Sequence, residues 1–236
     1  MSGKKVLVLG GTGPAGICLL RELVHRNHAT ILLARTPSKL PGDLVSNSLI
    51  EVIEGEMSDT KALDSAMARS SIVVSLLGPN INDKHIDPSL YADIYRNYVF
   101  PAMKKYSVRR ILAMGTISIK QPEDHWTFFQ TMVTIVMPLL NGAVYRNMHN
   151  LAHLFGKEGH DLDWTIFRIA QIPGESDETS WRQDRDLGLF TGWIGEKGWT
   201  STLRRGALAR WLVDGVEGKM DVWVHKMPGI SQLAGV

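Results

Sequence analysis

The chain has 236 residues, of which 44% are hydrophobic and 21% are charged, a composition typical of a globular domain with a sizeable core. The 26 lysines and arginines stand against 24 aspartates and glutamates. A net charge of +2 argues against nucleic acid or an anionic membrane as the main partner. Cys18 is the only cysteine, which excludes an intrachain disulfide and a cysteine-based metal site. We expect a cytoplasmic protein without a metal, since the N-terminal apolar run is too short for a signal peptide.

Short apolar runs alternate with helical segments along most of the chain. Strands are predicted at residues 6–9, 31–34, 50–53, 72–76, 111–114 and 164–169. Helices are predicted at residues 15–26, 60–69, 88–105, 144–156 and 204–216. Continuous apolar strands separated by helices indicate a parallel sheet covered on both faces, so we expect a doubly wound α/β Rossmann fold. We expect one domain over residues 1–236, with residues 171–202 as a small substrate cap inserted near its C-terminal end.

A glycine-rich turn at residues 10–16 follows the first predicted strand and opens the first helix. Gly10 permits a tight turn, Gly13 lets the backbone approach a pyrophosphate, and Gly16 allows close helix packing. Pro14 suits the first helical position, and the free N–H groups there favour a phosphate. The turn predicts dinucleotide binding; the alternative is a Rossmann domain that has lost its cofactor. The predicted cofactor-binding residues of this turn are Gly10, Thr12, Gly13, Pro14, Ala15 and Gly16.

The end of the second predicted strand carries cations where an NAD-dependent enzyme would carry an acid. No aspartate or glutamate occurs between Ala29 and Leu40, whereas Arg35 and Lys39 are both present. Such a pair suits the 2′-phosphate of NADP(H), so NADP(H) is the predicted cofactor. The alternative is two solvated surface charges.

The segment 128–144 is strongly apolar, but it contains several polar residues and Pro138. A transmembrane span is not expected, because a span needs about 18 or more clean apolar residues. We expect a helix that lines a pocket or faces a partner, which would allow a homodimer. Contact with a membrane surface is the alternative.

Four runs of sequence resemble a known family: VLVLGGTGPAG, ILLARTPSKL, VVSLLG and DWTIFRIA. Together with Gly55-Glu56 they resemble the atypical short-chain dehydrogenases/reductases, especially the NmrA-like and biliverdin/flavin reductase B groups. The likeness extends over about residues 5–170 and includes small NAD(P)-binding proteins of fungal secondary-metabolite clusters. It implies that Leu77 and Gly78 line the nicotinamide side of the cofactor. The family has Arg-Pro after the sixth strand, where this chain has Arg168-Ile169.

The resemblance also implies catalytic residues. In the superfamily, a Tyr-x-x-x-Lys pair donates a proton and holds the nicotinamide ribose, and a serine or threonine orients the carbonyl. The matching residues here are Tyr145, His149 in place of lysine, and Thr116. Tyr145 and His149 would share a helical face, but a mostly neutral histidine would lower the tyrosine's pKa only weakly. Tyr145 is either catalytic or a buried structural residue, and His153 is either a pocket or a surface residue.

Three functions are compatible with these residues. The first is an NADPH-dependent reductase of a small apolar or aromatic carbonyl, quinone or enone in secondary metabolism. The second is an isomerase, dehydratase or cyclase that uses Tyr145, His149 or His153 as acid or base, and the third is an NADP-sensing regulator. The apolar helix and a tryptophan-rich mouth motivate the substrate class. Those tryptophans are Trp126, Trp181, Trp193 and Trp199, and nearby Asp124 and His125 are predicted to be solvated.

Overall fold

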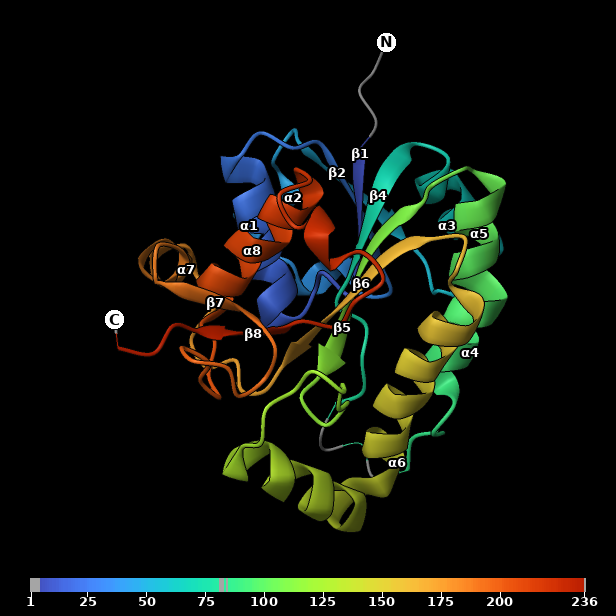
Figure 1. Ribbon diagram of the computed structural model, residues 1–236. Helices are drawn as coiled ribbons and strands as arrows, with labels where there is room; N and C mark the ends of the chain where they lie inside the picture. The colour runs from blue at the N-terminus through green and yellow to red at the C-terminus, as the bar shows by residue number, and fades with distance from the viewer. Residues whose placement is uncertain (1–4, 81–82, 84, 236) are drawn as a thin grey trace.

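The computed structural model describes residues 5–80, 83 and 85–235, and these form an eight-stranded sheet (Figure 1). The strand order is β3-β2-β1-β4-β5-β6-β8-β7. Every neighbouring pair from β3 to β8 is parallel, and β7 is antiparallel to β8. The doubly wound α/β prediction is therefore confirmed. The strands are β1 (Lys5–Leu9), β2 (Thr30–Ala34), β3 (Ile50–Glu54), β4 (Ser70–Ser75), β5 (Arg110–Thr116), β6 (Asp163–Ile169), β7 (Leu189–Gly192) and β8 (Gly229–Gln232).

Helices cover both faces of the sheet. Alternate strand residues point to opposite faces, and both sets are apolar, so each face needs a layer of helices to bury it. Leu7 and Leu9 of β1 pack against the first layer of helices, whereas Val6 and Val8 pack against the second. The first layer contains α3 (Thr60–Met67), α4 (Leu90–Ile94), α5 (Phe100–Lys105) and the second half of α6 (Phe128–Glu158). The second layer contains α1 (Pro14–His25), α2 (Gly42–Val45), α7 (Glu178–Arg185) and α8 (Arg205–Val216).

Two predicted helices differ from the observed ones. The helix expected at 88–105 is interrupted between α4 and α5 by a π-helical turn at Tyr95–Val99. This turn lies just before Pro101, which has no N–H to donate to the carbonyl four residues earlier. The helix expected at 144–156 is continuous with the one expected over 128–144: both belong to α6, which is kinked at Asn141, where φ is −148° and ψ is 73°.

The segment 171–202, expected to be a cap, contributes both a helix and a strand. Its helix α7 packs beside α1 and α8, and its strand β7 is the edge strand next to β8. Trp181 of α7 is 2% exposed and packs on Cys18 and Ala209, so its predicted place at the active-site mouth is wrong. A covering role for the remainder of this segment stays a prediction.

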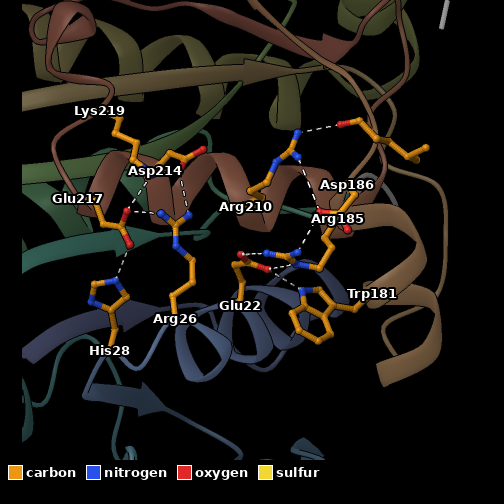
Figure 2. A network of polar contacts seen from close by, with 11 residues as sticks. Glu22, Arg26, His28, Trp181, Arg185, Asp186, Arg210, Asp214, Glu217 and Lys219 are labelled. Carbon is orange, nitrogen blue, oxygen red and sulfur yellow. Dashed lines mark hydrogen bonds and ion pairs between the residues drawn. The ribbon is translucent and has the colours of Figure 1, made fainter.

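A network of charged side chains fastens the α7–α8 pair to α1 (Figure 2). Glu22 of α1 is fully buried, accepts two hydrogen bonds of 2.9 Å from Arg185, and accepts a third of 3.2 Å from the Trp181 indole. Further along α1, Arg26 donates to Asp214 at 2.8 Å and to Glu217. Removing one partner of such a buried pair leaves a buried charge uncompensated, so these contacts fix α7 and α8 against α1.

We expect Glu217 to make stability depend on pH in the acid range. Burial raises its pKa, but hydrogen bonds from His28, Lys219 and Arg26 outweigh this and lower it to about 2, from an ordinary value of 4.5. Its contribution to the free energy of unfolding is complete above that ordinary value and is lost as pH falls toward 2. Urea unfolding across this range should show a shallower pH dependence in Glu217→Gln. Glu178→Gln, which removes only an exposed pair with Arg182, should follow the wild type, and a parallel decline in all three proteins would contradict this assignment.

Candidate functional site

A cavity of about 480 Å³ opens at the carboxyl ends of β1, β2 and β4, with the segment after β3 on one side. In open parallel sheets with this strand order, ligands bind beside the carboxyl ends of the strands. Five predicted cofactor-binding residues line the cavity: Gly10, Thr12, Arg35, Lys39 and Leu77.

The glycine turn that borders this cavity has the geometry expected of a phosphate-binding turn. Gly10 has φ +78°, and a Cβ there would lie 2.9 Å from the Leu76 carbonyl carbon. A Cβ on Gly16 would lie 2.4 Å from the Gly11 Cα, so Gly16 packs on the turn itself. A Cβ on Gly13 would meet nothing closer than 4.0 Å. The space beside Gly13 is therefore open to a phosphate, and the turn fits a dinucleotide.

The first turn of α1 adds backbone donors to this geometry. The helix begins at Pro14, with Gly13 as its N-cap, which agrees with the predicted first helical position. Pro14 and Ala15 lie behind the turn and are not among the residues that line the cavity. Their part in binding a phosphate would come from the helix N-terminus and not from their side chains.

Two tyrosines complete the wall of this cavity, and neither was predicted from the sequence. Tyr91 lies on α4 and Tyr98 on the π-helical turn, and Ile94 lies between them on the same wall. Burial and the charge of Asp83 raise the pKa of Tyr91, and the charge of Arg35 acts in the opposite direction. The spacing of three and then four residues places all three side chains on one helical face, and that signal could have revealed them.

A second cavity of about 280 Å³ lies at the carboxyl ends of β5 and β6. The first half of α6 contributes Phe129, Val133 and Met137 to its wall, which is mainly apolar. The second half of α6 contributes Tyr145 and Met148. The expectation that the apolar segment lines a pocket is therefore confirmed in its geometry.

The polar groups of the second cavity come from the end of β5 and from α6. Thr116 and Ser118 both line the cavity, and their hydroxyl oxygens are 2.7 Å apart. Ser118 was not predicted, although it lies only two residues beyond Thr116. Tyr145 lines the same cavity, so the structure brings two of the predicted catalytic residues to one site.

His149 packs behind Tyr145. The two rings are stacked with centroids 4.1 Å apart and an interplanar angle of 28°. The Nε2 atom of His149 is buried and has no hydrogen-bond partner among the described residues. Burial lowers the pKa of His149, and the backbone of Ser118 offsets this only in part. The imidazole is therefore neutral at pH 7 and supplies no fixed positive charge to the tyrosine.

His153 does not reach the site. It is exposed on α6, and it lines neither cavity. Each step of four residues turns about 40° around an α-helix, so His153 has rotated about 80° from Tyr145. This placement does not support the catalytic role predicted for His153.

The segment 77–79 separates the two cavities. Leu77 lines the first cavity and Pro79 lines the second. A Cβ on Gly78 would lie 2.7 Å from the Met114 Cε, and Met114 lines the second cavity. Ligands in the two cavities would therefore approach each other beside Leu77 and Gly78.

Asp124 is buried, so the prediction that it is solvated is wrong. Its side chain is 4% exposed and that of Arg168 is 0% exposed, and the two form hydrogen bonds of 2.5 and 2.7 Å. Asp124 also accepts a hydrogen bond from the Gln130 side chain at 3.2 Å. Burial raises the pKa of Asp124, but Arg168 holds it below its usual range. This pair anchors the loop between β5 and α6, whereas neighbouring His125 is exposed as expected.

Several solved structures of NAD(P)-binding proteins and oxidoreductases have the same fold as this chain. A short-chain dehydrogenase/reductase from Veillonella parvula in complex with NADP is 15% identical, with a TM-score of 0.73 over 98% of this chain and 95% of the other. A Rossmann-fold NAD(P)-binding protein from Shigella flexneri is 22% identical, with a TM-score of 0.63 over 99% and 95%. An oxidoreductase from Lactococcus lactis is 16% identical, with a TM-score of 0.67 over 97% and 90%. At these identities the likeness establishes the fold alone.

A match to a family model identifies the family of this chain as well as its fold. The model of NAD(P)H-binding proteins matches residues 10–217, from the glycine turn to the residue after α8. The match includes both cavities and all strands except β1 and β8, in agreement with the resemblance to atypical short-chain dehydrogenases/reductases. This chain therefore belongs to the NAD(P)H-binding family.

Proposed function

We propose that this protein is an NADPH-dependent reductase of a small apolar carbonyl, quinone or enone. The observation that carries the proposal is the apolar second cavity, which holds Thr116, Ser118 and Tyr145 and lies across the segment 77–79 from the first cavity. Bound NADPH would supply the hydride for the reduction. The apolar wall from α6 replaces the tryptophan-rich mouth as the basis for the substrate class, since the four tryptophans do not line this cavity.

The residues around the substrate oxygen would have different roles in the reaction. The Thr116 and Ser118 hydroxyls would bind the carbonyl oxygen, and the Tyr145 hydroxyl would donate a proton to it. His149 would hold the Tyr145 ring in place by stacking against it. A quinone or enone suits this arrangement better than a simple ketone, because its conjugation spreads the developing negative charge.

A labelled hydride tests the reductase directly. NADPH carrying deuterium on one face of the nicotinamide would be incubated with the protein and a panel of quinones, enones and aromatic ketones. We expect one NADPH consumed for each product molecule, with the deuterium transferred from one face only. Absence of turnover across the whole panel would contradict a reductase.

A second candidate is a non-redox isomerase, dehydratase or cyclase on the same scaffold. Tyr145 favours it, because it lines the second cavity and its hydroxyl could act as acid or base there without a hydride, whereas His149 stacks against its ring and lines neither cavity. In the labelling experiment, product formation without consumption of NADPH would select this candidate over the reductase.

Arg35→Ala should weaken NADPH binding by about 1–3 kcal/mol, or roughly 5- to 150-fold in Kd, the range of a hydrogen bond to a charged group. Arg35, Thr36 and Lys39 line the first cavity at the end of β2 and would bind the 2′-phosphate that NADH lacks. NADH affinity should therefore stay unchanged in a fluorescence titration with both nucleotides. Arg182→Ala, which removes an exposed arginine on α7, is the control. Equal losses for NADPH and NADH would refute recognition of the 2′-phosphate by Arg35.

A further inference from the structure

The first half of α6 projects from the body of the molecule, at the bottom of Figure 1. We call residues 128–140, which end just before the kink at Asn141, the α6 arm. The arm contains no charged residue. By length and composition α6 could cross a membrane, and it is not a buried core helix, because only 17% of its most apolar 18-residue stretch is buried. At 1.5 Å per residue the arm is about 20 Å long, too short for a bilayer core of about 30 Å.

The two faces of the α6 arm have different surroundings. One face lines the second cavity, as described above. The outward face is exposed and apolar: Phe128 is 68% exposed, Met132 40%, Ile135 57% and Leu139 81%. Leu140 and Trp126 beside it are 72% and 78% exposed. An apolar surface of this size on a soluble domain marks an interaction site.

The spacing of the outward side chains identifies the kind of partner. Phe128, Met132, Ile135 and Leu139 follow one another by four, three and four residues. This is the spacing of a coiled-coil seam, in which each side chain inserts between four residues of a facing helix. We call these four residues the α6 seam. Their pattern fits another helix better than an irregular protein surface or a lipid surface.

We infer that the α6 seam pairs with the same seam of a second copy of this chain. A two-fold axis makes one patch self-complementary, so no other apolar patch is required. Elsewhere in the described residues, large exposed apolar side chains occur singly, at Val45, Leu90, Leu187 and Val222. Among the residues that the structure describes, the α6 seam therefore has no complementary apolar patch other than itself.

Area and charge favour a second copy over a membrane. The seam with Trp126 and Leu140 offers six large apolar side chains that are 40–81% exposed, enough to form the apolar core of a standard interface of roughly 800 Å² per partner. A helix that lies on a membrane presents lysines and arginines on its polar face. The α6 arm has none, and its inner face is occupied by the second cavity.

Pairing would also stabilise the second cavity. The α6 arm contacts the body mainly through the side chains that line the cavity and through Gln130, which is 3% exposed and donates to Asp124 and to the Ile117 carbonyl. A partner arm would cover the outward face and hold this wall in position. The dimer is independent of the reaction catalysed, so it can be tested whether or not the protein is a reductase.

Sedimentation velocity of the full chain over a wide concentration range tests the pairing. We expect a dimer for the wild type and a monomer for Ile135→Glu/Leu139→Glu. The control Val222→Glu changes an exposed valine outside the seam and should remain a dimer. Circular dichroism and NADPH binding would establish that each variant is folded. The milder Ile135→Ala/Leu139→Ala should dimerise about tenfold more weakly or worse, as expected for central interface residues.

Three results would overturn the inference. One is a wild type that stays monomeric at every concentration. Another is a dimer that persists in folded Ile135→Glu/Leu139→Glu, since the interface would then lie elsewhere. The third is flotation of the wild type with vesicles of phosphatidylcholine and phosphatidylserine that is lost in Ile135→Glu/Leu139→Glu, which would assign the seam to a lipid surface.

Discussion

Asp124→Ala should destabilise the protein by about 3–5 kcal/mol, because it leaves the guanidinium of Arg168 buried without its partner. Arg168 is fully buried, and its remaining hydrogen bonds go to the carbonyl oxygens of Ile119 and Met227. Those carbonyls carry no full charge to balance it. The loss should appear as a lower midpoint in urea unfolding with little change in slope.

Controls separate this buried pair from ordinary ion pairs. Asp163→Asn removes an ion pair with Arg109, which is 66% exposed, and should cost less than about 1 kcal/mol. In Asp124→Leu/Arg168→Met both charges are absent, so we expect it to recover part of the lost stability. If Asp124→Ala costs no more than Asp163→Asn, the pair does not anchor the loop before α6.

Tyr145→Phe should lower kcat by about 10²–10⁴-fold, the usual contribution of a positioned proton donor. The variant keeps the aromatic ring and its stacking on His149, so the second cavity should hold its shape. NADPH affinity should remain unchanged, because Tyr145 does not line the first cavity. Steady-state kinetics on a substrate found by the labelling experiment, with a separate NADPH titration, would measure both quantities.

Two histidine variants refine the assignment. His149→Phe preserves a flat ring behind Tyr145 and should lower kcat less than Tyr145→Phe does, since a neutral imidazole mainly positions the tyrosine. His153→Phe alters an exposed side chain outside both cavities and should leave kcat unchanged. Full turnover in Tyr145→Phe would contradict Tyr145 as the proton donor. The proton would then have to come from the Thr116 or Ser118 hydroxyl or from water.

The sheet and the glycine turn could be predicted because their signals are local. Val6, Leu7, Val8 and Leu9 make one continuous apolar run, as expected of a strand buried on both faces. The turn from Gly10 to Gly16 follows directly in the sequence, and its glycines occur at the spacing of a dinucleotide-binding turn, although Gly10 also packs against Leu76, far away in the sequence.

The rest depends on contacts between distant parts of the chain. Asp124 and Arg168 are 44 residues apart, and nothing in the sequence around Asp124 distinguishes it from a solvated loop acid. The α6 arm was expected as a helix, but it is apolar on two faces at once, so its sequence alone did not show which face lines a cavity and which is exposed. The residues of β8 form only a short run, and their place between β6 and β7 comes from pairing with strands far away in the sequence.

The strand order determines in which order the chain can fold at the β7 edge of the sheet. Strand β7 precedes β8 in the chain, but it pairs with β8, which lies between β7 and β6. During synthesis, β7 therefore leaves the ribosome about forty residues before its neighbour exists. Until then β7 has no edge to join, and α7 beside it is held by Glu22 and Arg185. The nascent chain thus acquires its nucleotide-binding half first and closes this edge of the sheet last.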